Sequence, residues 1–528
     1  MPLTPPQCGV LPCSEWRDYR RLHSATLSIP QAYPGTPSFQ SLIIPLNLRL
    51  NYTPVALALP TTIPQIQDAV KCASKFGVRV NPRSGGHSYA SHSLGGEDGH
   101  LVVDLRYFRD VVVDRKTNVA TIGPGARLGN VALALFEQGE RALPHGVCPG
   151  VGIGGHVLHG GQGYSTHTHG LLLDHLISAT VILPNSTLVT VSRTHHSSLF
   201  WALRGAGMSF GIVTSLQFLT LPAPPQNILF YYPYLWTEPQ ARLGWDAWQS
   251  YCGGLIMPRE MNIRWVVANY GGGFAVFLLE GHYHGSQADF DLSIAPLLSA
   301  LGKIGGLQEG IRGVGAHALG WIDALLYANN NGLFNDLGSG EPLETPLNYS
   351  VHSTFFTKSL MTSNLSPPSI DVFLNRLYNT SPISPVTSYL IIFAQGGPTS
   401  AVPLPLNPQT STSYAHRTSL YEWQFIASLP SPPFPAAGID WLNAFVGDIE
   451  RAEVDAQRVA AGGAGNEGKG GNGGGGVLGA YYNYADPSLG RGEDSGGRYW
   501  LTNYPILKAL KRRYDPDFVF MNPQTVGT

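Results

Sequence analysis

The chain has 528 residues, 43% of them hydrophobic, which is too long for one simple core, so we expect two domains. Its 33 lysines and arginines nearly balance 35 aspartates and glutamates, with no basic block or charged tail, which argues against nucleic acid as a partner. No apolar run reaches the length of a transmembrane helix, so we expect no membrane partner either. We expect a monomer.

The N-terminus and the cysteines bear on the compartment. Residues 1–6 lack the charged start and apolar core of a secretory signal. This favours an intracellular protein over a secreted one, unless the given N-terminus is not that of the precursor. The five cysteines, at positions 8, 13, 72, 148 and 252, are too few for a disulfide scaffold, and no pair has zinc-site spacing. We therefore expect no metal site.

The first 220 residues alternate short apolar runs with turns. Residues 1–45 are rich in proline and serine and predict an arm over the surface. Apolar residues at helical spacing, ended by Gly77, predict a helix over residues 63–76. The same reasoning predicts a helix over 131–138 and strands over 78–80, 101–105, 119–122, 178–183 and 212–219.

The remaining chain is richer in aromatic residues. The proline run at 222–225 indicates a domain boundary. Beyond it, residues 275–279 and 387–394 are predicted strands, and residues 461–476 contain ten glycines and predict a flexible loop. A basic helix is predicted over residues 506–514.

Two glycine-rich stretches each contain one nucleophilic side chain. Residues 83–89 read Arg-Ser-Gly-Gly-His-Ser-Tyr and contain His87, and residues 145–156 read His-Gly-Val-Cys-Pro-Gly-Val-Gly-Ile-Gly-Gly-His and contain Cys148. Glycine lets the backbone approach a flat ligand closely and takes φ > 0 without strain. A histidine and a cysteine held this way are placed to bond covalently to a bound cofactor.

The paired motifs resemble the berberine bridge enzyme-like branch of the vanillyl-alcohol oxidase flavoproteins. In that family the histidine bonds the 8-methyl carbon of FAD and the cysteine bonds carbon 6 of the same ring. The resemblance implies bicovalent FAD, held through His87 and Cys148. Residues 95–100, 166–171 and 414–417 are similar to the fungal glucooligosaccharide oxidase group.

The resemblance also implies the fold and its division. We expect an α+β protein with two domains, a PCMH-type FAD-binding domain and a substrate domain built on a large antiparallel sheet. The expected segments are an N-terminal arm (1–45), the FAD-binding domain (46–222), the substrate-binding domain (223–476) and a C-terminal segment returning to the FAD-binding domain (477–528).

The family pattern further assigns residues to the cofactor. Its implied FAD contacts, besides the two anchors, are Arg83, Ser84, Gly85, Gly86, Ser88, Val151, Gly152, Gly154, Gly155, His156 and Gly161. Residues 150–155 also match the GxGxxG pattern, and Asp174 lies nineteen residues beyond. We reject a Rossmann site, because that motif should follow a buried strand and open a helix, and residues 144–149 do not read as a strand.

Val151 and Tyr484 carry the expected chemistry. A small residue at the position of Val151 in this family leaves room for O2, which implies an oxidase that makes hydrogen peroxide. Residues 481–484 read Tyr-Tyr-Asn-Tyr and match the family's Tyr-x-Asn-Tyr motif, whose last tyrosine is the general base. A phenol has a pKa near 10, so a neighbouring cation or hydrogen bonds must favour the phenolate of Tyr484. The alternative is a tyrosine of the core.

The substrate pocket departs from the sugar oxidases. Those enzymes carry a glutamine and an aspartate on the strand before a Gly-Gly pair, where this chain has Ile391 and Phe393. Losing buried polar partners weakens sugar binding, because each unpaired hydroxyl costs roughly 1–3 kcal/mol. The other expected pocket residues are Tyr89, Lys358, Tyr389 and Tyr481.

Three functional hypotheses follow. The apolar wall and the N-terminus favour an oxidase of a hydroxylated or phenolic small metabolite in fungal secondary metabolism, with that substrate and O2 as partners. The second hypothesis is a secreted oligosaccharide oxidase that forms a lactone and peroxide. The third is a flavin-bearing cyclisation scaffold without net redox chemistry, against which Val151 and Tyr484 argue.

A disulfide is also implied by the resemblance. In secreted relatives a cysteine near the N-terminus bonds one on the first helix. Cys72 matches the helix position, and Cys8 or Cys13 could be its partner. The alternative is that all three are ordinary thiols, and a disulfide would argue against a reducing compartment.

Overall fold

The computed structural model describes residues 29–311, 313–330, 342–403, 411–460 and 478–528. We call residues 29–222 the N-terminal lobe and residues 223–460 the sheet lobe. In chain order the N-terminal lobe contains β1 (Gln31–Ala32), α2 (Phe39–Leu42), β2 (Ala56–Ala58), α3 (Ile63–Phe76), β3 (Val80–Arg83), β4 (Leu101–Asp104), β5 (Val111–Asp114), β6 (Val119–Ile122), α4 (Leu128–Glu137), β7 (Arg141–Ala142), α5 (Ile153–Val157), α6 (Thr166–His169), β8 (Leu176–Ile182), β9 (Leu188–Ser192), α7 (Ser197–Ala206), β10 (Ile212–Leu219) and β11 (Leu221–Pro222).

The N-terminal lobe is built on two main sheets. One has the strand order β1-β2-β4-β3, in which β2, β4 and β3 run parallel and β1 is antiparallel to β2. The other is antiparallel with the order β5-β6-β10-β8-β9. Residues 31–32, within the predicted arm, therefore add a strand to the first sheet, while residues 1–28 lie outside the described residues.

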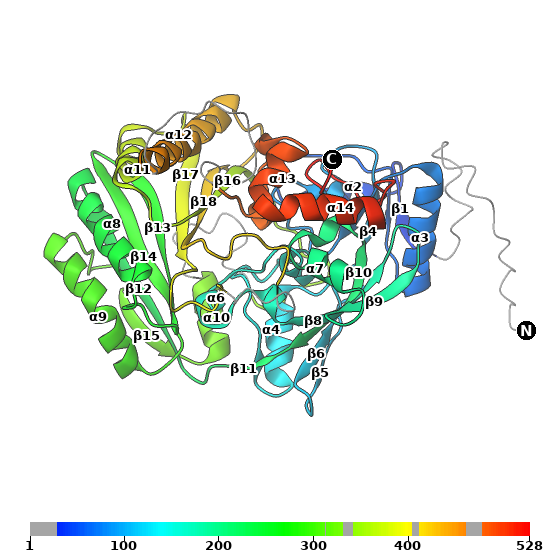
Figure 1. Cartoon of the computed structure of the whole chain (residues 1–528), viewed down its shortest axis with the longest axis horizontal. Coiled ribbons are helices and arrows are strands. Elements are labelled where there is room, and N and C mark those ends of the chain that lie inside the picture. Colours follow the sequence, from blue (N-terminus) through cyan, green and yellow to red (C-terminus); the bar gives the residue numbers. More distant parts are fainter. Residues whose placement is uncertain (1–28, 312, 331–341, 404–410, 461–477) are drawn as a thin grey trace, which may run out of the picture.

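The sheet lobe and the C-terminal segment complete the chain (Figure 1). Their helices and strands are β12 (Asn227–Trp236), α8 (Glu238–Gly253), β13 (Met261–Gly271), β14 (Phe274–Tyr283), α9 (Gln287–Ile304), β15 (Gly315–Leu319), α10 (Trp321–Asn330), β16 (Thr354–Thr362), α11 (Pro367–Asn379), β17 (Thr387–Ala394), β18 (Tyr421–Leu429), α12 (Ala436–Ala460), α13 (Glu493–Tyr499) and α14 (Tyr504–Tyr514).

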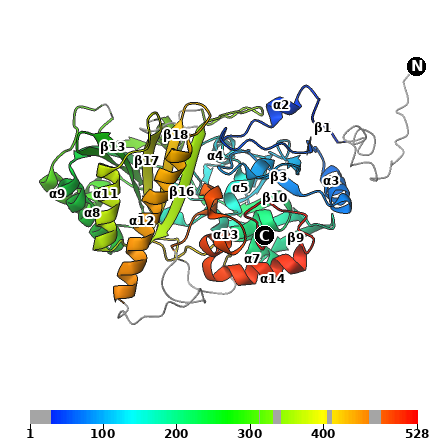
Figure 2. The ribbon, with the colours of Figure 1, turned by 90° about the horizontal axis from the view of Figure 1, so that it is seen from above.

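A seven-stranded antiparallel sheet, ordered β15-β12-β14-β13-β17-β18-β16, forms the centre of the sheet lobe. Helices α8, α9, α11 and α12 cover its outer face, and the N-terminal lobe lies against its inner face (Figures 1 and 2). Because successive side chains of a strand point to opposite faces, Trp265 packs in the helix-covered core while Arg264 faces the N-terminal lobe. Side chains of the inner face therefore point toward the N-terminal lobe and can form a site together with it.

The C-terminal segment returns to the N-terminal lobe. Phe520 bridges to Val80, the first residue of β3, and the Trp500 indole N–H donates to the Gly205 carbonyl at 2.9 Å. Tyr499, Trp500 and Tyr504 join the core formed by the antiparallel sheet of that lobe. The segment thereby brings residues 481–484 between the two lobes.

Several predicted elements have the observed bounds because their local signals are strong. Helix α3 spans the predicted 63–76, starting with a capping box between Thr62 and Gln65 and ending at Gly77, whose φ of 67° suits glycine. Strands β10 and β17 also match their predictions. Other predicted ends differ by a few residues, as for α4.

Some predictions concern residues that the structure does not describe. The glycine-rich loop 461–476 lies outside the described residues, as do Cys8 and Cys13, so the disulfide stays a prediction. Their proposed partner Cys72 is buried on α3.

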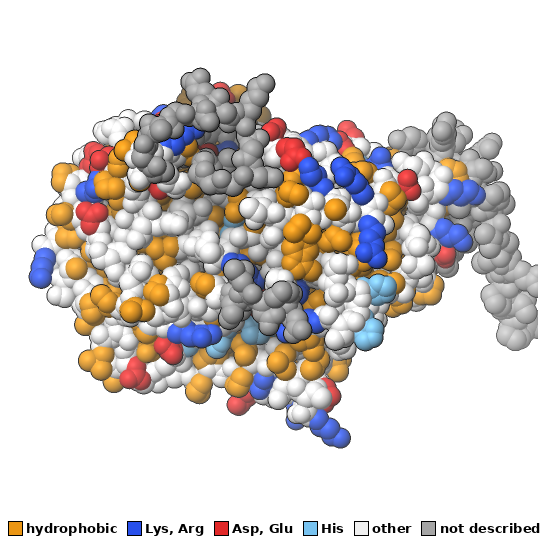
Figure 3. Space-filling view, viewed as in Figure 1, with side chains coloured by type: hydrophobic (Ala, Val, Ile, Leu, Met, Phe, Trp, Pro, Cys, Tyr) orange, Lys and Arg blue, Asp and Glu red, His pale blue; other side chains and the backbone are white. Residues whose placement is uncertain are grey.

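The distribution of charge on the surface agrees with the even charge balance of the sequence. Acidic and basic side chains are interspersed over the face drawn in Figure 3. Among the described residues, no helix is long and apolar enough to cross a membrane. The described part of the chain also holds no cluster of three or more histidine, cysteine or acidic side chains that could bind a metal ion.

Candidate active site

A cavity lies between loops of the N-terminal lobe, the C-terminal segment and the inner face of the seven-stranded sheet. It encloses about 1720 Å³ of space, its solvent-open part included. The predicted site residues that line it are Ser84, Gly85, Gly86, His87, Ser88, Tyr89, Cys148, Val151, Gly152, Gly154, Gly155, His156, Tyr389, Ile391, Phe393, Tyr481 and Tyr484. The structure thus brings both expected anchors and the expected base onto one cavity.

The two glycine loops touch at Gly85 and Gly152. A Cβ atom on Gly85 would lie 2.4 Å from the Gly152 nitrogen, and one on Gly152 would lie 2.1 Å from the Gly85 nitrogen. Both positions therefore require glycine. Gly86, next to His87, adopts a φ of +76°, which L-residues rarely take. The glycines thus set the close approach of the His87 and Cys148 loops.

Buried histidines around the anchors are neutral. The Gly146 N–H donates to His156 Nε2 at 3.0 Å, so that nitrogen carries no proton. Burial, together with the neighbouring His145 and His87, lowers the pKa of His156 to about 3. Burial also lowers the pKa of His145. This environment favours uncharged imidazole, the form in which a histidine is nucleophilic.

The glycine motif at residues 150–155 does not have a Rossmann context. It leads only into α5, a helix of five residues. The preceding strand β7 has two residues and ends at Ala142, and it belongs to a separate two-stranded sheet with β11. Rejection of the dinucleotide fingerprint is therefore confirmed.

Tyr484 lines the cavity, but its surroundings disfavour the phenolate. Burial raises the pKa of Tyr484 well above 10, and Glu422, Tyr89 and Tyr481 raise it further. Arg264 lowers that pKa but is outweighed. The expectation that a cation or hydrogen bonds favour the phenolate is thus met only in part, because desolvation of the phenol dominates.

Arg264, on β13, is a cavity residue that the sequence analysis missed. Its Nε donates to Glu280 Oε1 on the neighbouring strand β14 at 2.6 Å. Its guanidinium lies 4.5 Å from the Tyr164 ring centroid and 5.0 Å from that of Phe393, which is directly opposite on β17. Burial would lower the pKa of Arg264, but Glu280 and Tyr164 raise it, so the cavity wall contains a fixed cation. A single arginine inside the otherwise apolar run 263–268 was the available signal.

Gln424 and Glu422 are two further missed residues, both on β18. Gln424 lines the cavity opposite Ile391 on β17, and its Nε2 donates to the Tyr89 hydroxyl at 3.0 Å. Glu422 is fully buried, and neither of its carboxylate oxygens has a hydrogen-bond partner among the described residues. Burial raises the pKa of Glu422 well above its ordinary value, because a carboxylate is poorly solvated there.

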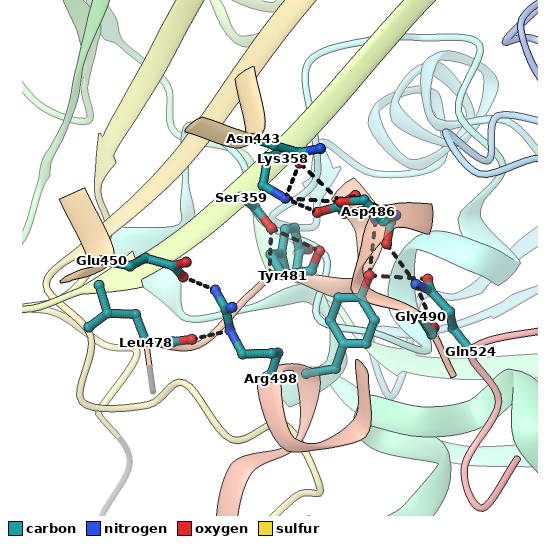
Figure 4. Close-up of polar contacts among 12 residues, drawn as sticks. Lys358, Ser359, Asn443, Glu450, Leu478, Tyr481, Asp486, Gly490, Arg498 and Gln524 are labelled. Atoms are coloured by element: carbon teal, nitrogen blue, oxygen red, sulfur yellow. Dashed lines mark hydrogen bonds and ion pairs between the residues drawn. The ribbon is translucent and has the colours of Figure 1, made fainter. Parts of the chain in front are cut away.

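Lys358 does not line the cavity, contrary to the sequence prediction. On β16 it pairs with Phe425 of the helix-covered core, so it points to the outer face of the sheet, whereas its neighbour Ser359 points inward. Its Nζ lies 2.5 Å from Asp486 and donates to Asn443 at 3.0 Å (Figure 4). Lys358 therefore ties the C-terminal segment to α12.

Arg83 and Gly161 also lie outside the described lining of this cavity. Arg83 ends β3 and pairs through Nε and Nη2 with Asp104 at the end of the parallel strand β4, so its side chain is already committed. The Gly161 N–H donates to the Tyr481 hydroxyl at 3.0 Å and orients that ring. The polar groups of both residues bond to other protein atoms. Both residues therefore stabilise the loops around the cavity and do not line it.

Comparison with known proteins agrees with this site. Residues 54–192 match the model of the FAD binding domain, and residues 480–527 match that of berberine and berberine-like proteins. The xylooligosaccharide oxidase of Thermothelomyces thermophilus is 40% identical over 506 residues, covering 94% of this chain and 92% of the relative. The chain belongs to the berberine bridge enzyme-like FAD-linked oxidases. The FAD-linked oxidoreductase dpmaF of Metarhizium anisopliae is 37% identical over 501 residues, covering 94% of this chain and 89% of the relative.

Solved structures of this family share the fold. The xylooligosaccharide oxidase of Myceliophthora thermophila, in complex with xylobiose, superposes with a TM-score of 0.82 at 36% identity, over 97% of this chain and 98% of that chain. The glucooligosaccharide oxidase of Acremonium strictum, which has 6-S-cysteinyl, 8α-N1-histidyl FAD, gives 0.83 at 34% identity, over 95% and 97%. The predicted α+β fold with a large antiparallel sheet is confirmed.

FAD is the cofactor of this family, and the cavity fits it. Gly85 and Gly152 both line this cavity and pack against each other with no room for a Cβ atom, so only backbone borders the cavity at this point. Two nucleophiles of the kinds that attach flavins covalently, an imidazole and a thiol, line the same cavity. The chain is therefore an FAD-dependent oxidoreductase of the oxidase type.

Proposed function

We propose that the protein oxidises the reducing-end carbon of a short oligosaccharide to a lactone, with O2 as electron acceptor and hydrogen peroxide as second product. His87 and Cys148 would hold FAD through two covalent bonds. When bound, FAD accepts a hydride from the sugar carbon and passes the electrons to O2. Val151 would leave room for O2 at the flavin.

The double attachment is supported by the position of both nucleophiles. They come from two loops that touch through Gly85 and Gly152, and both line one cavity. The glucooligosaccharide oxidase structure, similar over 95% of this chain, carries a flavin bonded to one cysteine and one histidine. Neutral His145 and His156 beside the His87 loop favour its attack as an uncharged imidazole.

The sugar substrate is the part of the proposal that the relatives support most. Xylo-, gluco- and chitooligosaccharide oxidases match this chain at 35–40% identity over most of its length. The cavity also offers polar groups for hydroxyls, from Gln162, Arg264, Gln424 and Asn483. This outweighs our sequence hypothesis of a phenolic or lipophilic metabolite, which rested on two positions of one strand and on the N-terminus.

Tyr484 would take the proton of the sugar hydroxyl as hydride leaves the same carbon. Arg264 lines the same cavity and favours the ionised phenol, whereas burial opposes it. Because the pKa of Tyr484 is raised, turnover is expected to increase with pH as more of the phenol ionises. A base of this kind typically contributes about a hundred- to ten-thousand-fold in rate.

A second candidate is the oxidation of a lipophilic alcohol. Ile391 and Phe393 present apolar surface to the cavity, where the sugar oxidases are expected to have polar side chains. The relative dpmaF, an FAD-linked oxidoreductase without a sugar in its name, is as similar as the glucooligosaccharide oxidase, at 37% identity. This candidate keeps the cofactor and the base unchanged.

Product analysis separates the two candidates. The holoenzyme would be incubated in air with xylobiose, cellobiose, chitobiose and a series of long-chain primary and aromatic alcohols. Sugar oxidation yields stoichiometric peroxide and a product that opens to the aldonic acid, one oxygen heavier than the sugar. Peroxide with an alcohol and none with any sugar would overturn the oligosaccharide proposal in favour of the second candidate.

A further inference from the structure

Arg127 joins the two loops that carry the cofactor anchors. It is the residue before α4, and its Nη1 donates to the carbonyl of Gly85 at 2.9 Å and to that of Gly150. Gly85 is two residues before His87, and Gly150 is two residues after Cys148. One guanidinium nitrogen therefore spans the His87 loop and the Cys148 loop.

The backbone around Arg127 binds the same loops. The Leu128 N–H donates to the Val151 carbonyl, and the Ile153 N–H donates to the Ala126 carbonyl, both at 2.9 Å. The carbonyl of Pro124 accepts hydrogen bonds from the Ser84 hydroxyl and from the Gly154 N–H. The segment 124–128 thus serves as a common support for both loops, with Arg127 as its only side-chain link to the two carbonyls among the described residues.

Tyr349 of the sheet lobe covers this contact. The Arg127 guanidinium lies 4.6 Å from the centroid of the Tyr349 ring. The same ring packs against Gly150, where a Cβ atom would lie 2.1 Å from the ring. The sheet lobe therefore packs against the Cys148 loop through Tyr349, next to the hydrogen bond that Arg127 donates to Gly150 of that loop.

Arg127 acts from behind the active-site cavity. It is not among the described residues lining that cavity, but lines a separate one on the other side of the His87 loop, together with Tyr349. Burial lowers the pKa of Arg127 to about 10, which still leaves it protonated at neutral pH. A cation that donates to two carbonyls, each two residues from an anchor, can fix the loop spacing without touching the flavin.

We propose that Arg127 is a positioning residue. It holds the His87 and Cys148 loops at a spacing that lets both anchors reach one flavin ring, and Tyr349 packs over its guanidinium. This inference rests on the proposed double attachment of FAD. It assigns to Arg127 the formation of both bonds on the same molecule, and no part in substrate oxidation.

The arrangement predicts a specific defect. Each bond would replace one C–H bond of the flavin, at the 8-methyl carbon or at carbon 6, and one N–H or S–H bond of the protein, and the two electrons released would pass through the flavin to O2, the acceptor of the proposed reaction. Without the bridge, each loop still holds its own nucleophile, so either bond can form alone. The second bond, however, must find its carbon on a ring already fixed by the first. Arg127→Met should therefore lower the fraction of protein carrying doubly attached FAD by at least fivefold and leave singly attached FAD in its place. Tyr349→Ala should act in the same direction, more weakly.

A matched control is available in Arg204. Burial likewise lowers the pKa of Arg204 to about 10, its side chain donates to the carbonyls of Phe200 and Ser411, and its guanidinium lies 4.2 Å from the Phe200 ring centroid. It bonds to neither glycine loop. Arg204→Met should thus reproduce the loss of a buried arginine while leaving the double attachment unchanged. Arg127→Lys keeps the charge and should give an intermediate fraction.

Peptide mapping reads the two bonds directly. Trypsin releases His87 in residues 84–106 and Cys148 in residues 142–193, so doubly attached flavin joins both peptides and singly attached flavin carries one. The fraction of joined peptides would be measured for each purified holoprotein, together with its unfolding temperature. Joined peptides in wild type and in Arg204→Met, but mostly single ones in Arg127→Met, is the expected result.

Two other outcomes are separable. Equal fractions of joined peptides in wild type, Arg127→Met and Arg127→Lys would overturn the role of Arg127. Absence of joined peptides from wild type itself would overturn the proposed double attachment instead. If Arg127→Met does not fold, Arg127→Lys and Tyr349→Ala decide: wild-type fractions in both overturn the inference, and reduced fractions in both support it.

Discussion

The rings of Tyr89 and Tyr484 stack, with centroids 5.7 Å apart and planes inclined by 11°. Tyr89 follows the His87 anchor in the N-terminal lobe, whereas Tyr484 comes from the C-terminal segment. The sheet lobe contacts this pair, because Gln424 of β18 donates to the Tyr89 hydroxyl and Ile426 of the same strand packs in one cluster with both rings. All three parts of the chain thus meet at the expected base.

Replacing Tyr484 by phenylalanine should remove the base and keep the stack. We expect kcat to fall by about a hundred- to ten-thousand-fold, the contribution of a positioned general base. Flavin content and unfolding temperature should stay near those of wild type, since the ring remains. Steady-state peroxide formation measures the effect. Tyr504→Phe, in the core of the C-terminal segment, is the control, and equal loss in both variants would argue against a base.

Arg264 should set the pH at which the reaction proceeds. Arg264 lowers the pKa of Tyr484, so its removal raises that pKa and leaves Glu280 as an unpaired negative charge nearby. For Arg264→Met the rising limb of the kcat/KM profile should therefore move to higher pH. Arg264→Lys, which keeps the charge, should move it less. A profile unchanged in Arg264→Met would mean that Tyr484 is not the titrating group.

The apolar strand β17 should be adjustable toward sugar binding. Ile391 lies opposite Gln424 across β17 and β18, so Ile391→Gln adds an amide beside an existing one. A new hydrogen bond to a sugar hydroxyl is worth about 1.4 kcal/mol, which lowers KM for xylobiose or cellobiose about tenfold. Ile391→Leu, an apolar control, should leave KM unchanged. A KM that stays constant in both variants would show that Ile391 does not face the sugar.

Lys358 should matter for stability and not for substrate binding. Lys358→Met leaves Asp486, of which 2% is exposed, as an unpaired buried charge, and breaking such a pair costs about 3–5 kcal/mol. Denaturant unfolding measures this loss, while KM of the folded fraction should stay within about twofold of wild type. Arg458→Met, which breaks an ion pair whose side chains are 71% exposed, should cost less than about 1 kcal/mol. A changed KM with unchanged stability would show that Lys358 contributes to substrate binding, as the sequence predicted.

Buried neutral histidines should make the fold labile in acid. Burial lowers the pKa of His92, His156 and His284 from 6.5 to about 3. Between these values the unfolded chain binds more protons than the folded one, so the free energy of unfolding falls as pH drops below 6.5. Each histidine should contribute a loss of about 2 kcal/mol at pH 5. His284→Asn should lessen the difference in denaturant midpoint between pH 7 and pH 5, and an equal difference in both proteins would contradict this.

The sequence predicts the cofactor side of the site better than the substrate side. The anchors are local: glycines and a nucleophile lie within a few residues, so His87 and Cys148 could be identified before the fold was known. Helix α3 likewise has its cap and its terminal glycine next to it in the chain. Such features need no knowledge of distant contacts.

The substrate side depends on strand pairing and strand orientation. All nine residues of β16 are buried, so no alternation of polar and apolar residues indicates that Ser359 faces inward and Lys358 outward. The contact of Arg264 with Phe393 joins strands β13 and β17, which lie more than a hundred residues apart in the chain. Their register becomes visible only in the folded sheet, which is why Arg264 and Gln424 were missed.

The most direct test of the proposed function is anaerobic mixing of the flavin-loaded protein with xylobiose or cellobiose, followed by the admission of oxygen. We predict that the flavin absorbance bleaches at a rate that saturates with sugar concentration, and that oxygen restores it with release of about one peroxide per flavin. Flavin that no oligosaccharide bleaches, in protein that dithionite still reduces and oxygen reoxidises, would contradict a sugar oxidase and leave an intact oxidase of another alcohol.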